Sequence, residues 1–455
     1  MAPVKDMTRG NPTRLIVLFA LPVLAGNALQ QLYSLVDSLI VGRILGVTAL
    51  AAVTASGWLD WTVLSIAMGL AQGFSIQAAQ SFGAKDLPEL RRTVGQSILL
   101  ACAATVALEL LSQLLLPTVL TWLNTPPETF ALTERYLRII FAGLPLVMAL
   151  NVLAGFLRAL GNSRAPLIAM LCSTCVNIGL DLLFVGKLGM HVEGGALATV
   201  LAQGVSVTVC ALAVARLRQL HPAAEDLRPD HAMCRKLLRL GSPLAFQNLV
   251  ISIGGLVLQS VVNGFGFVFM AGYNAASRLQ GLVEIAGGSV GTAVGTFAGQ
   301  NYGARRLDRV RLGLRRSAQL AAVLGIAVGG VMVLFGRQLL SLFLVSEDPA
   351  LIGEILTFAY RFLCVMSAGL PMLYLLFVYR STLQGMGDTV IPMVSGFVEL
   401  AMRILAALLL PRLIAEWGVY FAEIAAWAGA AVLLMIGYYR RIAEVAARWN
   451  SSSLP

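Results

Sequence analysis

Charged side chains are scarce in this sequence. Aspartate, glutamate, lysine and arginine make up 12% of the 455 residues, against about a quarter in ordinary soluble proteins. Hydrophobic residues account for 58%, and the mean hydropathy is +0.80. This small fraction of charged residues provides too little polar surface to cover a water-soluble protein of this length. The composition therefore excludes an ordinary soluble enzyme and predicts a protein surrounded mainly by lipid.

Motifs for catalysis and nucleotide binding are also missing. The sequence has no Walker-type phosphate loop and no His-Glu-x-x-His pair, so it does not predict ATP hydrolysis or zinc-dependent catalysis. Three histidines, His191, His221 and His231, are scattered, and a single Cys172-x-x-Cys175 pair has no second pair near it. We therefore expect no metal site, no resident cofactor and no enzymatic activity.

Basic residues outnumber acidic ones, which gives a net charge of +10. In a soluble protein this excess would favour nucleic-acid binding. Here the basic residues gather in alternate short segments between apolar runs, which is typical of cytoplasmic loops. We therefore expect no nucleic-acid partner and a multi-pass protein of a bacterial plasma membrane with both termini in the cytoplasm. The first apolar run is too long for a signal peptide and includes Pro22 and Asp37, so it predicts a membrane helix.

Apolar segments long enough to span a bilayer follow one another with short breaks. They are residues 15–44, 49–79, 94–120, 131–157, 166–185, 194–215, 243–262, 267–298, 312–343, 351–379, 390–413 and 419–439. The predicted fold is an all-α integral membrane protein with about twelve transmembrane helices in two six-helix lobes. Residues 1–215 are expected to form the N-lobe, 216–240 a basic cytoplasmic linker, and 241–455 the C-lobe.

The two halves repeat each other's motifs in the same order. Gly143-Leu144-Pro145 matches Gly369-Leu370-Pro371 at an offset of 226 positions, and Pro22 matches Pro243 at an offset of 221. Further matches join Gly161 to Gly387, Pro166 to Pro392, and Gln80–Lys85 to Gln300–Arg305. Six helices in each half predict a parallel repeat about an axis along the membrane normal, an arrangement found in secondary transporters.

Four polar residues inside the first half are the strongest functional candidates. Asp37 lies about 22 residues from the cytoplasmic start of its helix, or ~33 Å along a straight helix, and Asp181 about 15 residues, or ~22 Å. Asn177 precedes Asp181 by four residues and shares its helix face, while Thr199 lies early in the sixth segment. All four are predicted to lie in the outer half of the N-lobe.

The chemistry of this set suits a small cation. Carboxylate, amide and hydroxyl oxygens bind hard cations, and paired buried carboxylates readily hold a proton. The residues therefore predict a site for a coupling ion, either H⁺ or Na⁺. The alternative is that each polar group only bonds a neighbouring helix.

The second half lacks this set of oxygens. At the repeat offsets Asp37 matches Leu258, Asn177 matches Arg403 and Asp181 matches Ala407. Glu399 lies one helical turn from Arg403, which predicts a structural ion pair. Other single acids, Asp60, Glu109 and Glu423, are expected near helix ends or facing protein.

Several motifs taken together resemble the multidrug and toxic compound extrusion (MATE) transporters, and the resemblance covers nearly the whole chain. They are Gln31–Gly42 around Asp37, the turns at Gly83–Lys85 and Gly303–Arg305, Leu157–Asn162 with Leu383–Asp388, Asn177–Asp181, and Gly194–Thr199. The resemblance implies two six-helix lobes around a central cleft, and export of organic, often cationic compounds in exchange for Na⁺ or H⁺. MATE ion-site positions match Asp37, Asn177, Asp181 and Thr199.

The branch of the family follows from the second half. One branch has additional acids in helices seven and ten, whereas helix seven here carries Gln247 and Gln259. The DinF-like branch therefore fits better. Because the acids are expected to be buried in the outer half of the lobe, we hypothesise alternating access by a monomer, with Pro22 as a bend in the first helix. Possible cavity residues are Gln30, Tyr33, Gln259 and Glu284.

Two rival functions remain at this point. A flippase for lipid-linked or amphipathic substrates belongs to the same superfamily, but such proteins usually line their cavity with several cations. A channel or membrane-embedded enzyme is disfavoured by the duplicated halves and the missing motifs.

Overall fold

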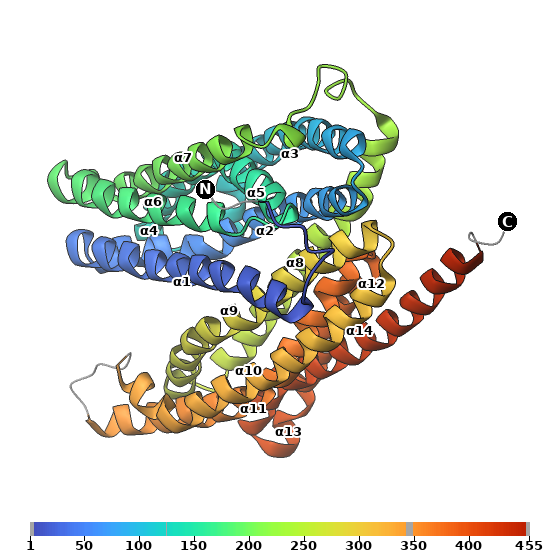
Figure 1. Ribbon diagram of the computed structural model, residues 1–455. Helices are drawn as coiled ribbons and strands as arrows, with labels where there is room; N and C mark the ends of the chain where they lie inside the picture. Colours follow the sequence, from blue (N-terminus) through green and yellow to red (C-terminus); the bar gives the residue numbers. More distant parts are fainter. Residues whose placement is uncertain (1–3, 124, 343–348, 452–455) are drawn as a thin grey trace. The chain divides into compact units, whose positions relative to one another are not determined.

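The computed structural model describes residues 4–123, 125–342 and 349–451, and every regular element in these ranges is a helix (Figure 1). The first half contains α1 (Pro12–Leu45), α2 (Val47–Ala84), α3 (Leu87–Trp122), α4 (Pro127–Ala142), α5 (Leu144–Ala159), α6 (Arg164–Asp181), the π-helix η1 (Leu182–Lys187), α7 (Val192–Ala215) and the short 3-10 helix η2 (Arg218–Leu220). The second half contains α8 (His231–Asn263), α9 (Phe267–Gly303), α10 (Leu307–Ser341), α11 (Pro349–Gly385), α12 (Val390–Leu409), α13 (Pro411–Ile414) and α14 (Trp417–Ser451).

The number of membrane spans agrees with the sequence prediction. Ten helices in the described ranges are long and apolar enough to cross a bilayer, and α4 with α5 forms an eleventh if this bent pair is one span. The remaining long helix, α9, has 37 residues but is richer in glycine and polar side chains. The predicted all-α membrane fold with about twelve spans is confirmed.

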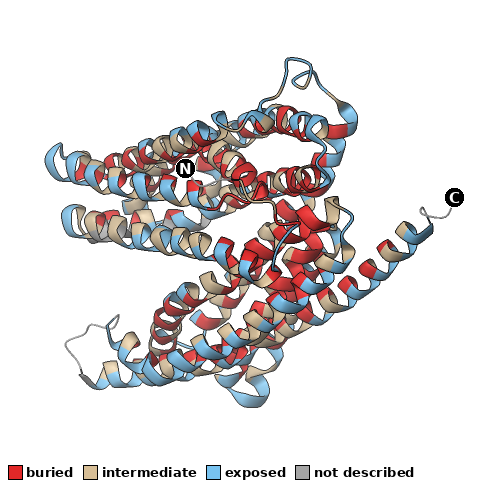
Figure 2. Cartoon of the chain, in the orientation of Figure 1, coloured by how far each residue is buried: buried red, intermediate tan, exposed pale blue. Residues whose placement is uncertain are grey.

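Apolar side chains remain exposed along the outer helices, as a lipid-facing surface requires. Leu114 on α3 is 74% exposed and Leu334 on α10 is 72% exposed. Figure 2 shows long stretches of exposed and half-buried residues on the helix faces, with buried residues between the helices. In water such faces would be strongly unfavourable, whereas in a bilayer they need no cover.

Three pairs of left-handed backbone positions repeat between the halves. Gly161 and Gly387 have φ angles of 81° and 82°, and Lys85 and Arg305 have 61° and 54°. A third pair, Gly46 and Gly266, has 85° and 92°. The first pair is 226 positions apart and the other two are 220 apart, which are the offsets of the sequence motifs. The repeat therefore extends to the backbone conformation of the loops.

The helices group into two compact units that exchange their first segments. Unit 1 comprises residues 1–6 and 21–245, and unit 2 comprises residues 7–20 and 246–455. The start of α1 thus belongs to the unit built from the second half, and the start of α8 to the unit built from the first. The lobe boundaries predicted from the sequence stay a prediction, since these units are defined by contacts rather than by chain order.

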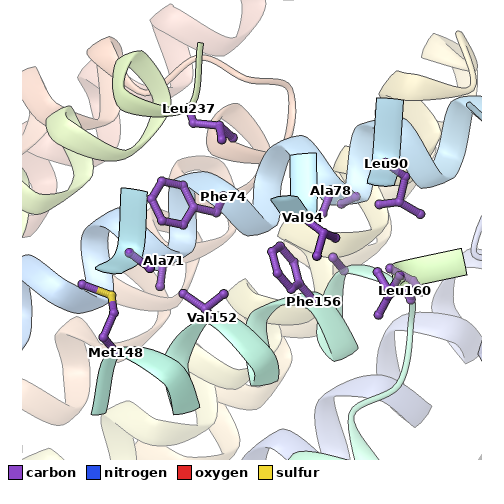
Figure 3. Packing of buried hydrophobic residues seen from close by; sticks show 14 of the residues in the cluster. Ala71, Phe74, Ala78, Leu90, Val94, Met148, Val152, Phe156, Leu160 and Leu237 are labelled. Carbon is purple, nitrogen blue, oxygen red and sulfur yellow. The ribbon is translucent and has the colours of Figure 1, made fainter. Parts of the chain in front are cut away.

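The core of unit 1 lies between α2, α3 and α5 (Figure 3). Phe74 and Phe156 are fully buried there, and small residues on α2, Ala71 among them, allow α5 to approach closely. At Gly155 an added Cβ would lie 2.1 Å from Ser75 Oγ, so a side chain here would require the Ser75 hydroxyl to move. Small residues on α2 therefore allow tight helix packing.

The start of α8 differs from the prediction. The sequence placed it at Pro243 after a polar linker, but α8 begins at His231. Met233 and Leu237 lie one turn apart and enter the core of unit 1, while Lys236 Nζ pairs with Glu89 at 2.8 Å. This amphipathic turn was hidden from a search for long apolar runs because its outer face is basic.

The fourth predicted helix is also different, because it is divided into α4 and α5 with a bend of 45°. The break falls at Gly143, two residues before Pro145, which has no N–H to continue the helical ladder. The counterpart α11 continues through Pro371 as a single helix. The predicted end of the ninth segment, residue 343, lies outside the described residues.

Unit 2 is built around α9 and α11. Gly287, Gly291 and Gly295 on α9 face α11, where an added Cβ on Gly287 would lie 2.3 Å from the Tyr374 ring. The segment before α1 is bound to the end of α9: Met7 is fully buried, and its backbone N–H donates to Gln300 Oε1 at 2.8 Å. The exchanged segment is thus an integral part of unit 2.

Candidate ion-binding site

Two helices of unit 1 present the predicted acids. On α1, Tyr33 and Asp37 lie four residues apart and therefore share a face. On α6, Asn177 and Asp181 have the same spacing. Asp181 is the last α-helical residue before η1, and π-helical turns of this kind are frequent at functional sites because they change the direction of side chains.

Asp37 and Asp181 are brought into direct contact. Their carboxyl groups lie within hydrogen-bonding reach of each other. Asp181 is only 1% exposed, and no donor among the described residues reaches either of its carboxylate oxygens. Two carboxyl groups can bond to each other only when one carries a proton, and two charged ones repel unless a cation lies beside them. Such a pair is chemically able to hold a cation or a proton.

Asn177 completes the polar face of α6. Its side chain is 0% exposed, and neither amide atom has a hydrogen-bond partner among the described residues. A buried amide without partners costs about 1–3 kcal/mol, so its position one turn from Asp181 calls for a functional reason. Its oxygen is a suitable additional ligand for a hard cation.

Thr199 joins the site through Tyr33 rather than through an acid. The Tyr33 hydroxyl donates to Thr199 Oγ1 at 2.9 Å, which links α1 to α7. Tyr33 also lies within electrostatic range of Asp37 and Asp181. All four predicted residues thus lie in one region of unit 1, although the contacts shown are two pairs, Asp37–Asp181 and Tyr33–Thr199.

Sequence reasoning missed two members of this region. Asp60 on α2 and Tyr136 on α4 are both within electrostatic range of Tyr33, and Tyr136 is also within range of Asp37 and Asp181. Asp60 was expected near a helix end or facing protein; it lies well inside α2, and its buried Oδ1 has no partner in the described part of the chain. The position of Asp60 in the middle of an apolar segment could have identified it from the sequence, whereas nothing in the sequence pointed to Tyr136.

Unit 2 contains a buried chain of ion pairs in place of these oxygens. Arg380 pairs with Glu399 at 2.7 Å, and Glu399 contacts Arg403 at 3.4 Å. Arg403 also pairs with Glu423 at 2.8 Å. The predicted Glu399–Arg403 contact is present. Arg380, one residue beyond the predicted apolar segment 351–379, lies inside α11 and is buried.

The remaining candidate residues are distributed over both units. Pro22 lies inside α1, which continues through it as one helix, and Gln30 on the same helix is exposed. On α8, Gln259 donates to Asn263 Oδ1 at 2.9 Å, and on α9 Glu284 accepts from Gln280 at 2.8 Å. Their roles as helix bend and cavity residues stay predictions.

One stretch of α9 has the residue spacing of a hydrolase motif. Residues 287–291 have the Gly-x-Ser-x-Gly spacing of a nucleophile elbow. The elbow requires a sharp turn between a strand and a helix, whereas Ser289 lies within α9, is 1% exposed and donates to the Ile285 carbonyl at 2.7 Å. This serine is therefore a packing residue and not a nucleophile.

Comparison with known proteins decides the family. The sequence profile of the MatE family matches two segments, residues 22–183 and 243–409. The chain belongs to the MatE family. The two matches begin 221 positions apart, at the repeated prolines Pro22 and Pro243, so the family unit itself occurs twice in the chain.

The relatives agree with this assignment. The chain is 30% identical over 349 residues to the probable multidrug resistance protein YpnP of Bacillus subtilis, covering 77% of this chain and 78% of the relative. It is 29% identical over 461 residues to YoeA of the same organism, also named a probable multidrug resistance protein, covering 96% of each. The protein is thus a MATE-family membrane transporter and not an enzyme.

The fold is also that of solved MATE structures. A structure described as the outward-facing conformation of a multidrug resistance MATE transporter has a TM-score of 0.90 and 24% identity, covering 98% of this chain and 99% of that one. At this identity the likeness establishes the fold alone. The DinF-like branch stays a prediction.

Proposed function

We propose that this transporter is a secondary active exporter of organic, often cationic compounds, driven by the entry of H⁺ or Na⁺ at the Asp37–Asp181 pair. Membership of a multidrug efflux family supports the class of transport. Asp37 and Asp181 form no ion pair with a cationic side chain among the described residues, which supports cationic cargo, since positive charge would be favoured near them. The proposal includes a monomer in a bacterial plasma membrane with both termini in the cytoplasm.

The observation that carries the proposal is the contact of the half-buried Asp37 carboxyl group with the buried one of Asp181, beside an unpartnered amide. Asp37 and Asp181 lie within hydrogen-bonding reach, and Asn177 is fully buried without a partner in the described ranges. A purely structural cluster would satisfy these groups from neighbouring helices. Groups left unsatisfied in this way are expected where an ion binds and leaves during each cycle.

The contact between the acids favours H⁺ as the coupling ion. A shared proton satisfies both carboxyl groups at once, with no further ligands. Na⁺ would require Asp37, Asp181 and Asn177 to surround it together with other oxygens. Thr199 Oγ1 already accepts a hydrogen bond from Tyr33, although it keeps a free lone pair for a cation.

Coupling requires that ion binding changes the packing of α1. In the proposed cycle the ion enters from outside, removes the repulsion between the two acids and shifts α1 relative to α6 and α7. Pro22 provides a point in α1 where an intrahelical hydrogen bond is missing and bending is cheap. The ion and the substrate favour different packings of α1, so ion binding releases the substrate outward.

Efflux by purified protein in proteoliposomes tests the proposal. Asp37→Asn keeps the size of the side chain but removes the exchangeable proton, so gradient-driven efflux should fall at least about tenfold. Glu109→Gln on α3 is the matched control, because it also neutralises an acid in a membrane helix of unit 1 but lies outside the site, and it should leave efflux unchanged. An Asp37→Asn protein that retains wild-type efflux would overturn the proposal.

A further inference from the structure

Unit 2 contains a groove of about 670 Å³ between α10, α11 and α14. None of its lining residues takes part in the transport proposed above. Arg311 and Arg315 from α10 lie at one part of the groove, with Ala318 and Ala322 further along the same helix. Spacings of three and four residues place all of them on one face of α10.

The arginines give the groove an unbalanced positive charge. Arg311 and Arg315 are both exposed, and in the described part of unit 2 the ion pairs formed by carboxylates involve other residues. Two guanidinium groups one helical turn apart, without an acid to neutralise them, attract a bidentate anion such as a phosphate group.

Tyrosines form the wall opposite α10. The ring centroids of Tyr379 and Tyr438 are 5.7 Å apart, and those of Tyr438 and Tyr439 are 5.3 Å apart. Tyr438 is 2% exposed, lies within electrostatic range of Arg311, and its hydroxyl has no hydrogen-bond partner among the described residues. A buried hydroxyl donor beside two free guanidinium groups is a third group suited to a phosphate oxygen.

The other part of the groove is apolar. Leu314, Ala318 and Ala322 from α10 and Ile442 from α14 line it. From Arg311 to Ala322 the groove follows α10 for 11 residues, or ~16 Å. A cationic part joined to an apolar part of this length matches an amphiphile with one anionic end better than a free inorganic ion.

We propose that this groove binds an anionic phospholipid, with its phosphate at Arg311 and Arg315 and an acyl chain along Ala318 and Ala322. Basic pockets between transmembrane helices on the cytoplasmic side bind such headgroups. The basic start of α10 is predicted to lie on that side, so the lipid comes from the inner leaflet. Tyrosines at the same level fit the interfacial zone, where amphipathic rings gather.

Native mass spectrometry of the full chain, released from membranes containing equal amounts of phosphatidylglycerol and phosphatidylcholine, tests this proposal. The wild type should retain phosphatidylglycerol. Arg311→Gln combined with Arg315→Gln should weaken retention about thirty-fold, which corresponds to about 2 kcal/mol. The control pair Arg440→Gln and Arg448→Gln removes the same charge from exposed positions on α14 outside the groove and should retain the lipid.

A second variant separates a lipid from a free phosphate ion. Ala322→Phe fills the apolar part without changing charge and should also lose phosphatidylglycerol. Millimolar inorganic phosphate should not displace the lipid. Equal retention by the arginine variant, equal retention of phosphatidylcholine by the wild type, or displacement by inorganic phosphate would overturn the proposal. Unchanged melting temperatures confirm that each variant is folded.

Discussion

At the scale of single residues, the same polar atoms that raise the cost of folding supply the proposed ion ligands. Asn177 is buried without a hydrogen-bond partner among the described residues, and Asp181 is buried with only the Asp37 carboxyl group within reach. The chain of ion pairs in unit 2 is the opposite case, because Glu399 and Arg403 are buried but paired on both sides. We propose that the unsatisfied oxygens of unit 1 bind the coupling ion, whereas the paired charges of unit 2 link α11, α12 and α14.

Asn177→Leu should separate these two roles. Leucine has nearly the same volume and removes an unpartnered amide, so the protein should be as stable as the wild type or gain about 1–3 kcal/mol. Ion-coupled efflux should nevertheless fall, because the amide oxygen is lost. Melting temperature and efflux measured on one preparation check both parts. A variant that loses stability but transports normally would show that the amide serves the fold.

Glu399→Gln should behave in the opposite way. It leaves Arg380 and Arg403 buried with only part of their counter-charge, since Glu423 still pairs with Arg403. Removing one partner of a buried ion pair typically costs about 3–5 kcal/mol. Chemical unfolding should show a loss of this size, against less than about 1 kcal/mol for Glu109→Gln. Unchanged stability of the Glu399→Gln protein would mean that the network does not hold α11, α12 and α14 together.

At the scale of helices, small residues decide how closely neighbours approach. Gly385 at the end of α11 and Gly288 on α9 are both helical glycines, but an added Cβ would lie 2.4 Å from the Gly295 carbonyl oxygen in the first case and meets nothing within 4 Å in the second. Contact with backbone leaves no flexible atom to move aside.

Gly385→Ala should therefore destabilise the protein by about 1–3 kcal/mol through overpacking. Gly288→Ala should stabilise it by about 0.5–1 kcal/mol, because alanine loses less conformational entropy in a helix. Thermal melting of the two variants beside the wild type provides the comparison. Equal changes in melting temperature from both substitutions would show that the end of α11 is not packed against Gly295 of α9.

Helix boundaries show where sequence reasoning succeeds and where it does not. The length of the apolar runs located the spans, because a helix must be long and apolar to cross lipid. The same criterion missed the amphipathic start of α8, where Met233 and Leu237 are buried and the opposite face is basic. It also joined α4 to α5, since local hydropathy does not reveal that Gly143 breaks a helix while Gly369 does not. Both errors concern contacts that only tertiary packing determines.

At the scale of the whole molecule, the chain is a duplicated scaffold, and the proposed ion site lies in one copy only. The left-handed positions Gly161 and Gly387 and the two family matches repeat at the offsets found in the sequence. The oxygens of Asp37, Asn177 and Asp181 do not repeat. Sequence comparison of the halves revealed this asymmetry, whereas the exchange of residues 7–20 into unit 2 depends on contacts such as that of Met7 with Gln300 and was not predictable.

Transport under separately imposed H⁺ and Na⁺ gradients tests the central claim most directly. In proteoliposomes the wild type should expel a cationic dye when an inward H⁺ gradient is applied, and Asp181→Asn should lose this response. Gln247→Asn, which shortens a buried amide side chain of unit 2 without changing its charge, should keep the response to the H⁺ gradient. If Asp181→Asn responds to either gradient as the wild type does, the acid pair of unit 1 does not couple ion entry to export.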